Sequence, residues 1–419
     1  MLKEKECFYY NVYVSEQVLK RSGFIFYMPE KIPFPAVRWY TVCIDILGDE
    51  TMKTYRIFII NPGSTSTKLS MFENDRCLFT VDTFHDSSEL LKFPTINDQL
   101  DYRMAVVHQF LAEKGIDLTG VDAIVGRGGG CCSILGGVYR IDDKLIEDTK
   151  NCAGGLYHSS MLGVQMAKAL HDEYGGELLM MDPPVVDELC DLARVTGVRG
   201  VYRTAISHAL NLKETARRHA KKLGKRYEDC NLIVCHIDGG ISVTAHHHGR
   251  MIDGIDAGGG EGPFTPTRIG SMAVTDVIGV LGDRTPQELK KLCSQAGGLT
   301  SHFGTSNSDV VHALVEKGDA RAIRVWQAMI YQVCKSIGSM AAVLEGNVDG
   351  IVLTGGLLRF DDVLADIKRR CGFIAPVTAY PGEFEQEAMA AGAMRVLIGE
   401  EMALVYPGRP VWNGFADEA

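Results

Sequence analysis

The first strong pattern in the chain is an apolar run that ends in a turn of small residues. Residues 55–60 are β-branched and aromatic, and they lead into Asn61-Pro62-Gly63. Lys68 to Phe72 then alternates like a returning strand. The pattern predicts a hairpin whose turn is rich in glycine, serine and threonine, rather than a strand followed by a helix.

The second half of the chain repeats this pattern. Residues 231–236 predict a strand, Asp238-Gly239-Gly240 a turn, and residues 241–245 a returning strand. The repeat is an echo of pattern and not of sequence identity. It suggests a duplicated α/β domain, in which each half offers one hairpin turn.

Apolar runs at 121–125, 178–181 and 351–354 predict three further buried strands. The first ends at the glycine segment 126–130, and the last ends at Gly355-Gly356. Helical spacing follows Ser159 and Ser160, and again Ser207, so these serines are the expected helix caps. Further helices are expected over about 323–344 and 385–397.

Composition narrows the class of protein. The 419 residues are 46% hydrophobic and 23% charged, which fits a globular chain of two domains. A net charge of −10 argues against a broad nucleic-acid or anionic-membrane surface, and no apolar run approaches membrane-spanning length. The 12 scattered cysteines favour free thiols in a reducing cytosol. Residues 1–51 lack a clear period and are interpreted as a non-native or appended extension.

The turn from Asn61 to Lys68 can bind an anion. Backbone N–H groups converge in such turns, the hydroxyls of residues 64–67 add donors, and Lys68 adds charge. The spacing is neither that of a Walker A loop nor that of a Rossmann fingerprint. Taken alone, the segment is better explained as a polar hairpin, and the case depends on the other glycine turns.

Several side chains at element ends could carry chemistry. Arg127 lies among glycines and can fork two phosphate or carboxylate oxygens, whereas for Arg268 structural and functional interpretations are even. Asp182 ends a strand and could orient Mg²⁺ or act as a plain turn residue. Each of His158, His208 and His236 is individually more often structural than catalytic. The run 246–248 is interpreted as a surface turn rather than a metal cluster.

Together these segments resemble the butyrate kinase branch of the acetate kinase family, within the acetate and sugar kinase/Hsp70/actin superfamily. The similarity covers nearly all of the chain from Met52 onward. The pieces that carry it are IINPGSTSTK (59–68), VGRGGG (125–130), HALN (208–211), HIDGGISVTAH (236–246), EGPFTPTR (261–268), LTGG (353–356) and YPGEFEQEA (380–388).

The resemblance implies two duplicated actin-like, ribonuclease H-type α/β domains with a nucleotide cleft between them. The first would span 52–183 plus about 385–419, with the C-terminal helix crossing back, and the second 184–384. It also implies transfer of a phosphoryl group between butyryl phosphate, or a similar acyl phosphate, and ADP, with Mg²⁺, in a cytoplasmic homodimer.

The resemblance also implies roles for particular residues. Arg127, Arg268, Asp182 and His208 would be catalytic, and His158 and Gly128 would line the substrate pocket. Glu385, Glu387 and Asp238 would organise Mg²⁺. The phosphates and nucleotide would contact Asn61, Ser64, Ser66, Lys68, His236, Gly239, Gly240, Gly355 and Gly356.

Three departures from the family pattern leave alternatives open. Residues 130–133 read Gly-Cys-Cys-Ser where leucines and a proline are usual, Ser207 replaces a phenylalanine, and Asp238 replaces a glycine. The chain could therefore act on acetate, propionate or branched-chain acids. It could also be a homologue that binds nucleotide without turnover.

Overall fold

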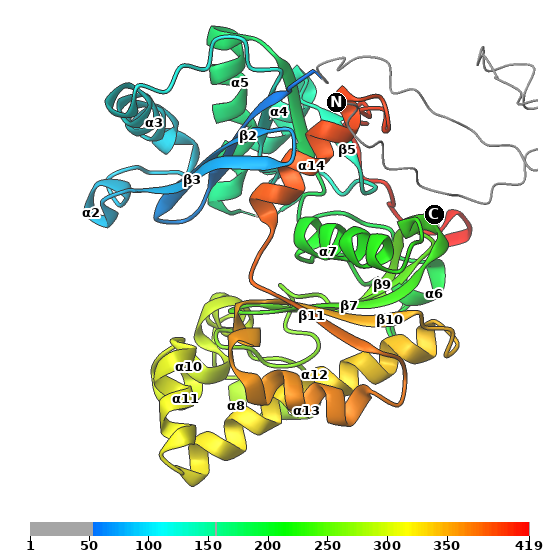
Figure 1. Cartoon of the computed structure of the whole chain (residues 1–419). Coiled ribbons are helices and arrows are strands. Elements are labelled where there is room, and N and C mark those ends of the chain that lie inside the picture. Colours follow the sequence, from blue (N-terminus) through cyan, green and yellow to red (C-terminus); the bar gives the residue numbers. More distant parts are fainter. Residues whose placement is uncertain (1–52, 156, 419) are drawn as a thin grey trace, which may run out of the picture. The chain divides into compact units, whose positions relative to one another are not determined.

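The computed structural model describes residues 53–155 and 157–418, and Thr54–Ala419 forms one compact unit (Figure 1). The interpretation of residues 1–51 as an extension lies outside the described residues. None of the described helices is both long and apolar enough to cross a membrane.

The first sheet has six strands and contains the first predicted hairpin. Strands β1 and β2 are antiparallel, β2 pairs with β3, and β1, β4 and β6 run parallel. Strand β5 adds an antiparallel edge. In spatial order the strands are β3 (Arg76–Phe84), β2 (Ser66–Glu73), β1 (Arg56–Pro62), β4 (Ala123–Gly126), β6 (Glu177–Met181) and β5 (Val138–Arg140).

The second sheet repeats five of these positions. Strands β7 and β8 form the antiparallel hairpin, β9 continues it, and β10 and β11 follow in parallel. Their order is β11 (Val377–Pro381), β10 (Gly350–Gly355), β7 (Asn231–Ile237), β8 (Ile241–His247) and β9 (Arg250–Gly254). The shared topology confirms the predicted duplication of an α/β domain.

Alternation along β1 buries both faces of the first sheet. Phe58 and Ile60 join the core formed with α3 (Leu100–Lys114) and α5 (Gly163–Tyr174). Ile57 and Ile59 join a separate core on the opposite face. There they meet residues of α14 (Glu385–Leu397), which lies beside the first sheet although it follows the second sheet in sequence (Figure 1). The predicted domain boundaries themselves remain predictions.

The second sheet is covered on both faces in the same way. Ile233, Cys235 and Ile237 face α12 (Ala320–Val343) and α13 (Asp361–Cys371), whereas Leu232 and Val234 face α7 (Ala209–Lys222). The remaining helices are α2 (Ser87–Leu90), α4 (Asp143–Lys150), α6 (Asp191–Arg194), α8 (Val274–Leu281), α9 (Pro286–Lys291), α10 (Gly298–Phe303) and α11 (Ser308–Glu316).

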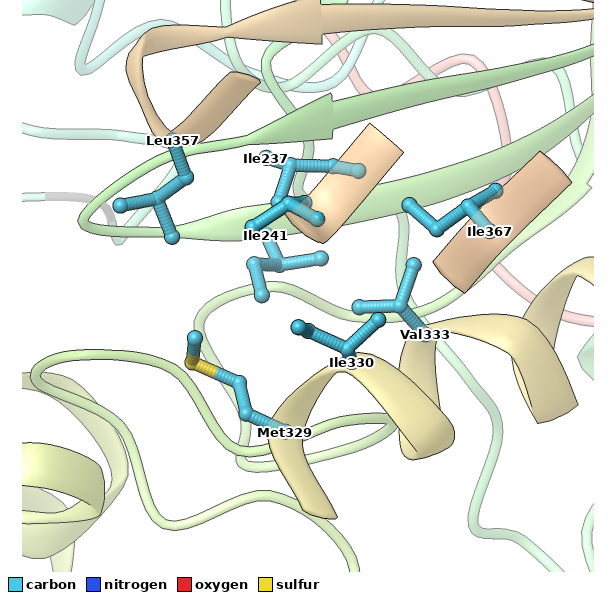
Figure 2. Close-up of a pocket in the computed structure, with 8 residues that line it drawn as sticks. Ile237, Ile241, Met329, Ile330, Val333, Leu357 and Ile367 are labelled. Atoms are coloured by element: carbon cyan, nitrogen blue, oxygen red, sulfur yellow. The ribbon is translucent and has the colours of Figure 1, made fainter. Parts of the chain in front are cut away.

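The turn of the second hairpin packs against an apolar core. Figure 2 shows Ile237 and Ile241, on either side of the turn, together with Met329 and Ile330 of α12. These side chains pack together with no room for a water molecule between them, and all are apolar, so they offer no group that could bind a phosphate. This packing against α12 supports the turn between Ile237 and Ile241.

The strands, the helix at 385–397 and the long helix after residue 320 are confirmed, but the predicted caps are wrong. His158 caps the turn Ser159–Leu162, because its Nδ1 accepts a hydrogen bond from the Ser160 N–H at 3.1 Å. In the part of the chain that the structure describes, helix α7 follows His208 without a side-chain cap, and the buried Ser207 hydroxyl has no hydrogen-bond partner. The surface-turn interpretation also fails at His246, which is buried in β8 and bonds to Tyr227.

Candidate active site

A buried arginine holds the turn of the first hairpin. The Gly63 N–H donates to Ser66 O at 2.8 Å, and Arg103 of α3 donates to three carbonyl oxygens of the same turn. Arg103 is fully buried and, among the described residues, has no carboxylate partner. Burial lowers the pKa of Arg103 to about 10, which still leaves it charged at neutral pH. The turn and its supporting cation together favour an anion.

Three predicted residues meet where β1, β4 and α14 converge. Asn61 donates Nδ2–H to Glu385 Oε2 at 2.9 Å, and Arg127 donates Nη2–H to Glu385 Oε1 at 3.0 Å. Burial alone would raise the pKa of Glu385, but Arg127 and the Asn61 hydrogen bond hold it below the usual value. The first sheet and α14 therefore bring an ionised carboxylate, an amide and a cation together at one place.

The second hairpin turn is tied to the turn after β10 by one carboxylate. Asp238 accepts hydrogen bonds from the Gly239 N–H at 2.7 Å and from the Gly356 N–H at 2.6 Å. Gly355, at the end of β10, has φ of 109°, a conformation that favours glycine. Two N–H groups that sequence reasoning assigned to phosphate or nucleotide are thus already engaged by Asp238.

Arg268 lies directly against this second turn. A Cβ atom on Gly240 would stand 2.6 Å from Arg268 Nη1, so a larger residue there would displace the guanidinium from its observed place. Thr265 and Thr267 donate their hydroxyls to Gly239 O and fasten the loop of Arg268 to the turn. Nε and Nη1 of Arg268 are nevertheless buried and have no hydrogen-bond partner among the described residues. Because buried donors are normally hydrogen-bonded, we infer that an anionic ligand supplies the acceptor for this guanidinium.

His208 and His236 stack beside the turn, with ring centres 4.0 Å apart and planes 21° apart. The Nδ1 atom of His208 lies 2.8 Å from Ser242 Oγ, and that of His236 lies 2.9 Å from Asn211 Nδ2. Burial lowers the pKa of His236 to about 4. The negative charges of Asp238 and Glu385 act in the opposite direction but do not offset the effect of burial. Burial, His236 and Arg268 hold the pKa of His208 well below its ordinary value. Both rings are therefore neutral at pH 7.

The structure offers one cluster of possible metal ligands among the described residues: His236, Asp238 and Glu383. Partial burial, followed by the charges of Glu385 and Asp238, raises the pKa of Glu383 to about 7. Mg²⁺ prefers oxygen ligands, so the imidazole does not suit it. Glu385 and the amide oxygen of Asn61 supply oxygens of the required kind.

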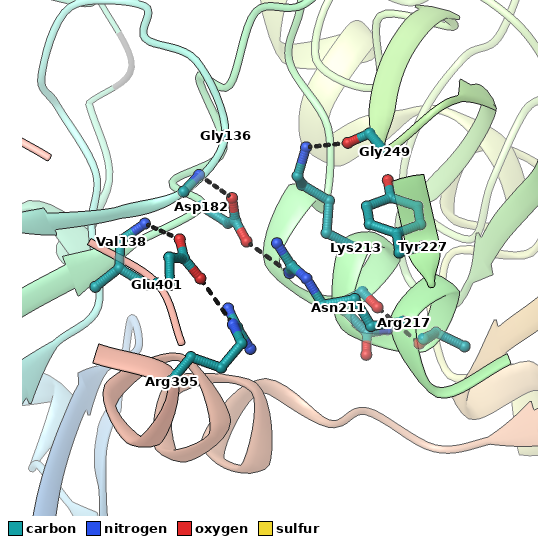
Figure 3. Close-up of polar contacts among 12 residues, drawn as sticks. Gly136, Val138, Asp182, Asn211, Lys213, Arg217, Tyr227, Gly249, Arg395 and Glu401 are labelled. Carbon is teal, nitrogen blue, oxygen red and sulfur yellow. Dashed lines mark hydrogen bonds and ion pairs between the residues drawn. The ribbon is translucent and has the colours of Figure 1, made fainter. Parts of the chain in front are cut away.

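Asp182 has structural partners. It accepts from the Gly137 N–H at 2.8 Å and pairs with Arg217 of α7 at 3.4 Å. Figure 3 shows this link next to Glu401, which joins the Val138 N–H to Arg395. These contacts hold β5 and α7 together, and the catalytic assignment of Asp182 remains a prediction.

The other predicted residues are spread around these groups. Lys68 lies on β2 and lowers the pKa of Glu383, whereas Ser64 engages Arg103 through its carbonyl and Ser66 lies 3.5 Å from Asp82. A Cβ at Gly128 would meet Met180 at 2.4 Å, which gives that glycine a packing role. Glu387 is two residues from Glu385 on α14, and side chains at that spacing do not face each other.

Sequence reasoning assigned no role to Arg103, Asn211 or Ser242, because their partners are distant in the chain. Arg103 contacts a turn 36 to 40 residues earlier, and Asn211 contacts His236, Thr354 and Phe384. One available signal was that Arg103 and Asn211 are polar residues at buried helix positions.

Comparisons with known proteins agree with this geometry. Residues 195–361 match the model of the acetokinase family. A probable butyrate kinase of Clostridium botulinum (strain Alaska E43 / Type E3) is 43% identical over 355 residues, which cover 84% of this chain and all of that protein.

Solved structures show the same fold. The acetate kinase of Porphyromonas gingivalis has a TM-score of 0.64 at 17% identity, over 82% of this chain and all of that one. A propionate kinase of Francisella tularensis has a TM-score of 0.62 at 18% identity, over 81% and 98%. The predicted actin-like fold is confirmed, and the extended match to the probable butyrate kinase shows that this chain belongs to the acetokinase family.

Proposed function

We propose that this protein is a short-chain carboxylate kinase that transfers a phosphoryl group reversibly between ATP and butyrate, giving butyryl phosphate and ADP. The 43% identity to a probable butyrate kinase supports butyrate as the first substrate to test. Acetate, propionate and branched-chain acids are the neighbouring alternatives.

One observation carries the proposal. Within residues 53–155 and 157–418, two buried nitrogen atoms of Arg268 have no hydrogen-bond partner, and its guanidinium lies against the Gly240 turn. Leaving charged donors unsatisfied costs more than leaving neutral ones, so a protein keeps such a group where a ligand will complete it. A transferring phosphoryl group provides oxygens that a guanidinium can bind in a fork.

The reaction requires positioning more than proton transfer. A carboxylate oxygen bonds to the γ-phosphorus while the bond from that phosphorus to the leaving oxygen of ADP breaks. Both the acid and ADP are ionised at neutral pH, so no general base is needed. Neutral His208 and His236 would act as hydrogen-bond donors, and Arg127 and Arg268 would offset the charge spread over the phosphoryl oxygens.

The ligand set suits Mg²⁺ on one side of the site. Glu385 and the amide oxygen of Asn61 would hold the ion, which, when bound, neutralises phosphate charge. Asp238 is a further candidate. Like Glu385, it accepts one hydrogen bond on each carboxylate oxygen, and each of these oxygens keeps a lone pair for a metal.

The family resemblance also implies a homodimer and a cytoplasmic location, and we include both in the proposal. The ten cysteines within the described ranges are all free thiols, which suits a reducing compartment.

The deciding experiment is a hydroxamate assay with ATP, Mg²⁺ and straight or branched carboxylates of two to six carbons. We expect trapped acyl phosphate, with the highest kcat/KM for butyrate. No product from any acid would refute the kinase, provided that circular dichroism shows a folded protein. Nucleotide binding without product would instead support a non-catalytic homologue.

A further inference from the structure

A chain of buried hydrogen bonds runs behind His236. At its centre is Asn211, which lies on α7 and is 1% exposed. Its Nδ2 atom lies 2.9 Å from His236 Nδ1 and 3.2 Å from Thr354 Oγ1, and its Oδ1 lies 3.0 Å from Phe384 N. One side chain thus connects α7, β7, β10 and the residue before α14.

The direction of every bond in this chain is fixed by chemistry. The Phe384 N–H can only donate, so the oxygen of the Asn211 amide must face it. The Gly382 carbonyl can only accept, and Thr354 gives its hydroxyl hydrogen to it at 2.9 Å. Thr354 Oγ1 is therefore an acceptor for Asn211 Nδ2. If the Asn211 amide were flipped, its NH₂ group would face the Phe384 N–H, and two donors would then meet without an acceptor.

The amide nitrogen of Asn211 must consequently donate to His236 Nδ1. That atom can accept only if it carries no proton, so the imidazole proton lies on Nε2. Nε2 is the ring nitrogen that faces the candidate active site. It lies 3.6 Å from Glu383 Oε1, and both groups belong to the cluster that includes Asp238. A protonated Nε2 can donate to an anion but has no lone pair for a metal.

We propose that Asn211 is a positioning residue that locks His236 in its Nε2–H tautomer, so that His236 donates a hydrogen bond to a phosphoryl oxygen. The identity of that acceptor rests on the proposed kinase function, whereas the tautomer does not. The arrangement also assigns the metal to oxygen ligands and excludes His236 from its coordination.

The tautomer can be read by two-bond ¹H–¹⁵N correlation spectra of the full-length protein labelled with [¹⁵N]histidine, with the His236 signals assigned from His236→Gln. We expect Nδ1 to resonate as an unprotonated nitrogen and Nε2 as a protonated one. The opposite pattern in the wild-type protein would overturn the proposal, whatever any variant does.

Asn211→Asp supplies the matched change. The carboxylate keeps an acceptor for the Phe384 N–H, but its second oxygen demands a proton on His236 Nδ1. We expect the tautomer to reverse and kcat to fall about 100-fold, the scale for removal of one transition-state donor, with KM changed much less. A reversed tautomer with unchanged kcat would end the catalytic role of Asn211.

Asn231→Asp is the control, because Asn231 also contacts a histidine: its Oδ1 lies 2.8 Å from His247 Nδ1, at the other end of β7. We expect neither the His236 signals nor kcat to change. Loss of kcat in both variants would point to a general sensitivity to added charge and would overturn the specific role of Asn211. A kinase-inactive wild type with the expected tautomer would refute the proposed function alone.

Discussion

The two hairpin turns share one topology but are stabilised by opposite charges. In the first turn, buried Arg103 donates hydrogen bonds to the carbonyl oxygens of Gly63, Ser64 and Ser66. In the second turn, the Asp238 carboxylate accepts hydrogen bonds from the N–H groups of Gly239 and Gly356. Duplication preserved the strand order, while the electrostatics of the two turns differ.

This difference indicates how each turn could meet a phosphate. The first turn has a cation behind it and needs no rearrangement of charge to accept an anion. The second has an anion within it, so its positive contribution must come from Arg268, which lies on Gly240, and from the N–H groups of the stacked histidines. We therefore expect the second turn to depend on side chains and the first on backbone.

The largest expected effect comes from removing the cation of the second turn. Arg268→Ala should lower kcat by about 100- to 1,000-fold, the scale for loss of a preorganised charge. Arg268→Lys should recover only part of this loss, because an ammonium cannot fork two oxygens. Steady-state kinetics with ATP and butyrate would measure both effects.

The control is Arg226→Ala, which removes an exposed arginine paired with Asp229 on the surface. We expect it to retain nearly full kcat. Near-normal turnover in Arg268→Ala would break the comparison, because the second turn would then work without its cation.

The next effect concerns the cation of the first turn and should appear in stability. Arg103→Met removes the Arg103 donor from the carbonyl oxygens of Gly63 and Ser64 and leaves Ser66 O with only the Gly63 N–H, so we expect the free energy of unfolding to fall by about 2 kcal/mol. The KM for nucleotide should rise as the turn loosens, with a smaller effect on kcat. Urea denaturation and initial-rate kinetics would separate the two effects.

Arg140→Met is the matched control for Arg103. Arg140 pairs with Glu177 at 2.8 Å, but both side chains are exposed, so its loss should cost about 0.5 kcal/mol. Equal losses for the two variants would show that Arg103 does no more for the first turn than a surface ion pair does.

Sequence alone predicts the hairpins and the helix at 385–397 because their signals are local. A glycine turn between apolar runs and a helical period each lie within about a dozen residues. The duplication could be predicted for the same reason, since each half carries its own copy of the local pattern.

The parts of the site that sequence does not predict depend on distant partners. Asp182 ends a strand, as expected, but its partner Arg217 lies 35 residues further on. The predicted serine caps fail because the His158 side chain takes the capping position and His208 precedes α7. Arg103 and Asn211 are ordinary helix residues until the fold brings distant backbone and side chains to them.

The smallest expected effect distinguishes between two possible roles of the Asp238 carboxylate. If its main effect is to occupy N–H groups that phosphate could use, Asp238→Gly should lower the KM for ATP several-fold. Stability should fall by about 1–2 kcal/mol, because two charge-assisted hydrogen bonds disappear. Asp238→Asn should lie between, since an amide keeps one acceptor.

A raised KM in Asp238→Gly, with the fold intact by circular dichroism, would reverse this conclusion. The carboxylate would then serve the nucleotide, by holding the turns around Gly239 and Gly356 at the spacing that the phosphates need. The second turn would be a preorganised site like the first, reached with an anion in place of a cation. The direction of the change in KM therefore decides whether the opposite charges reflect different functions or two solutions to the same one.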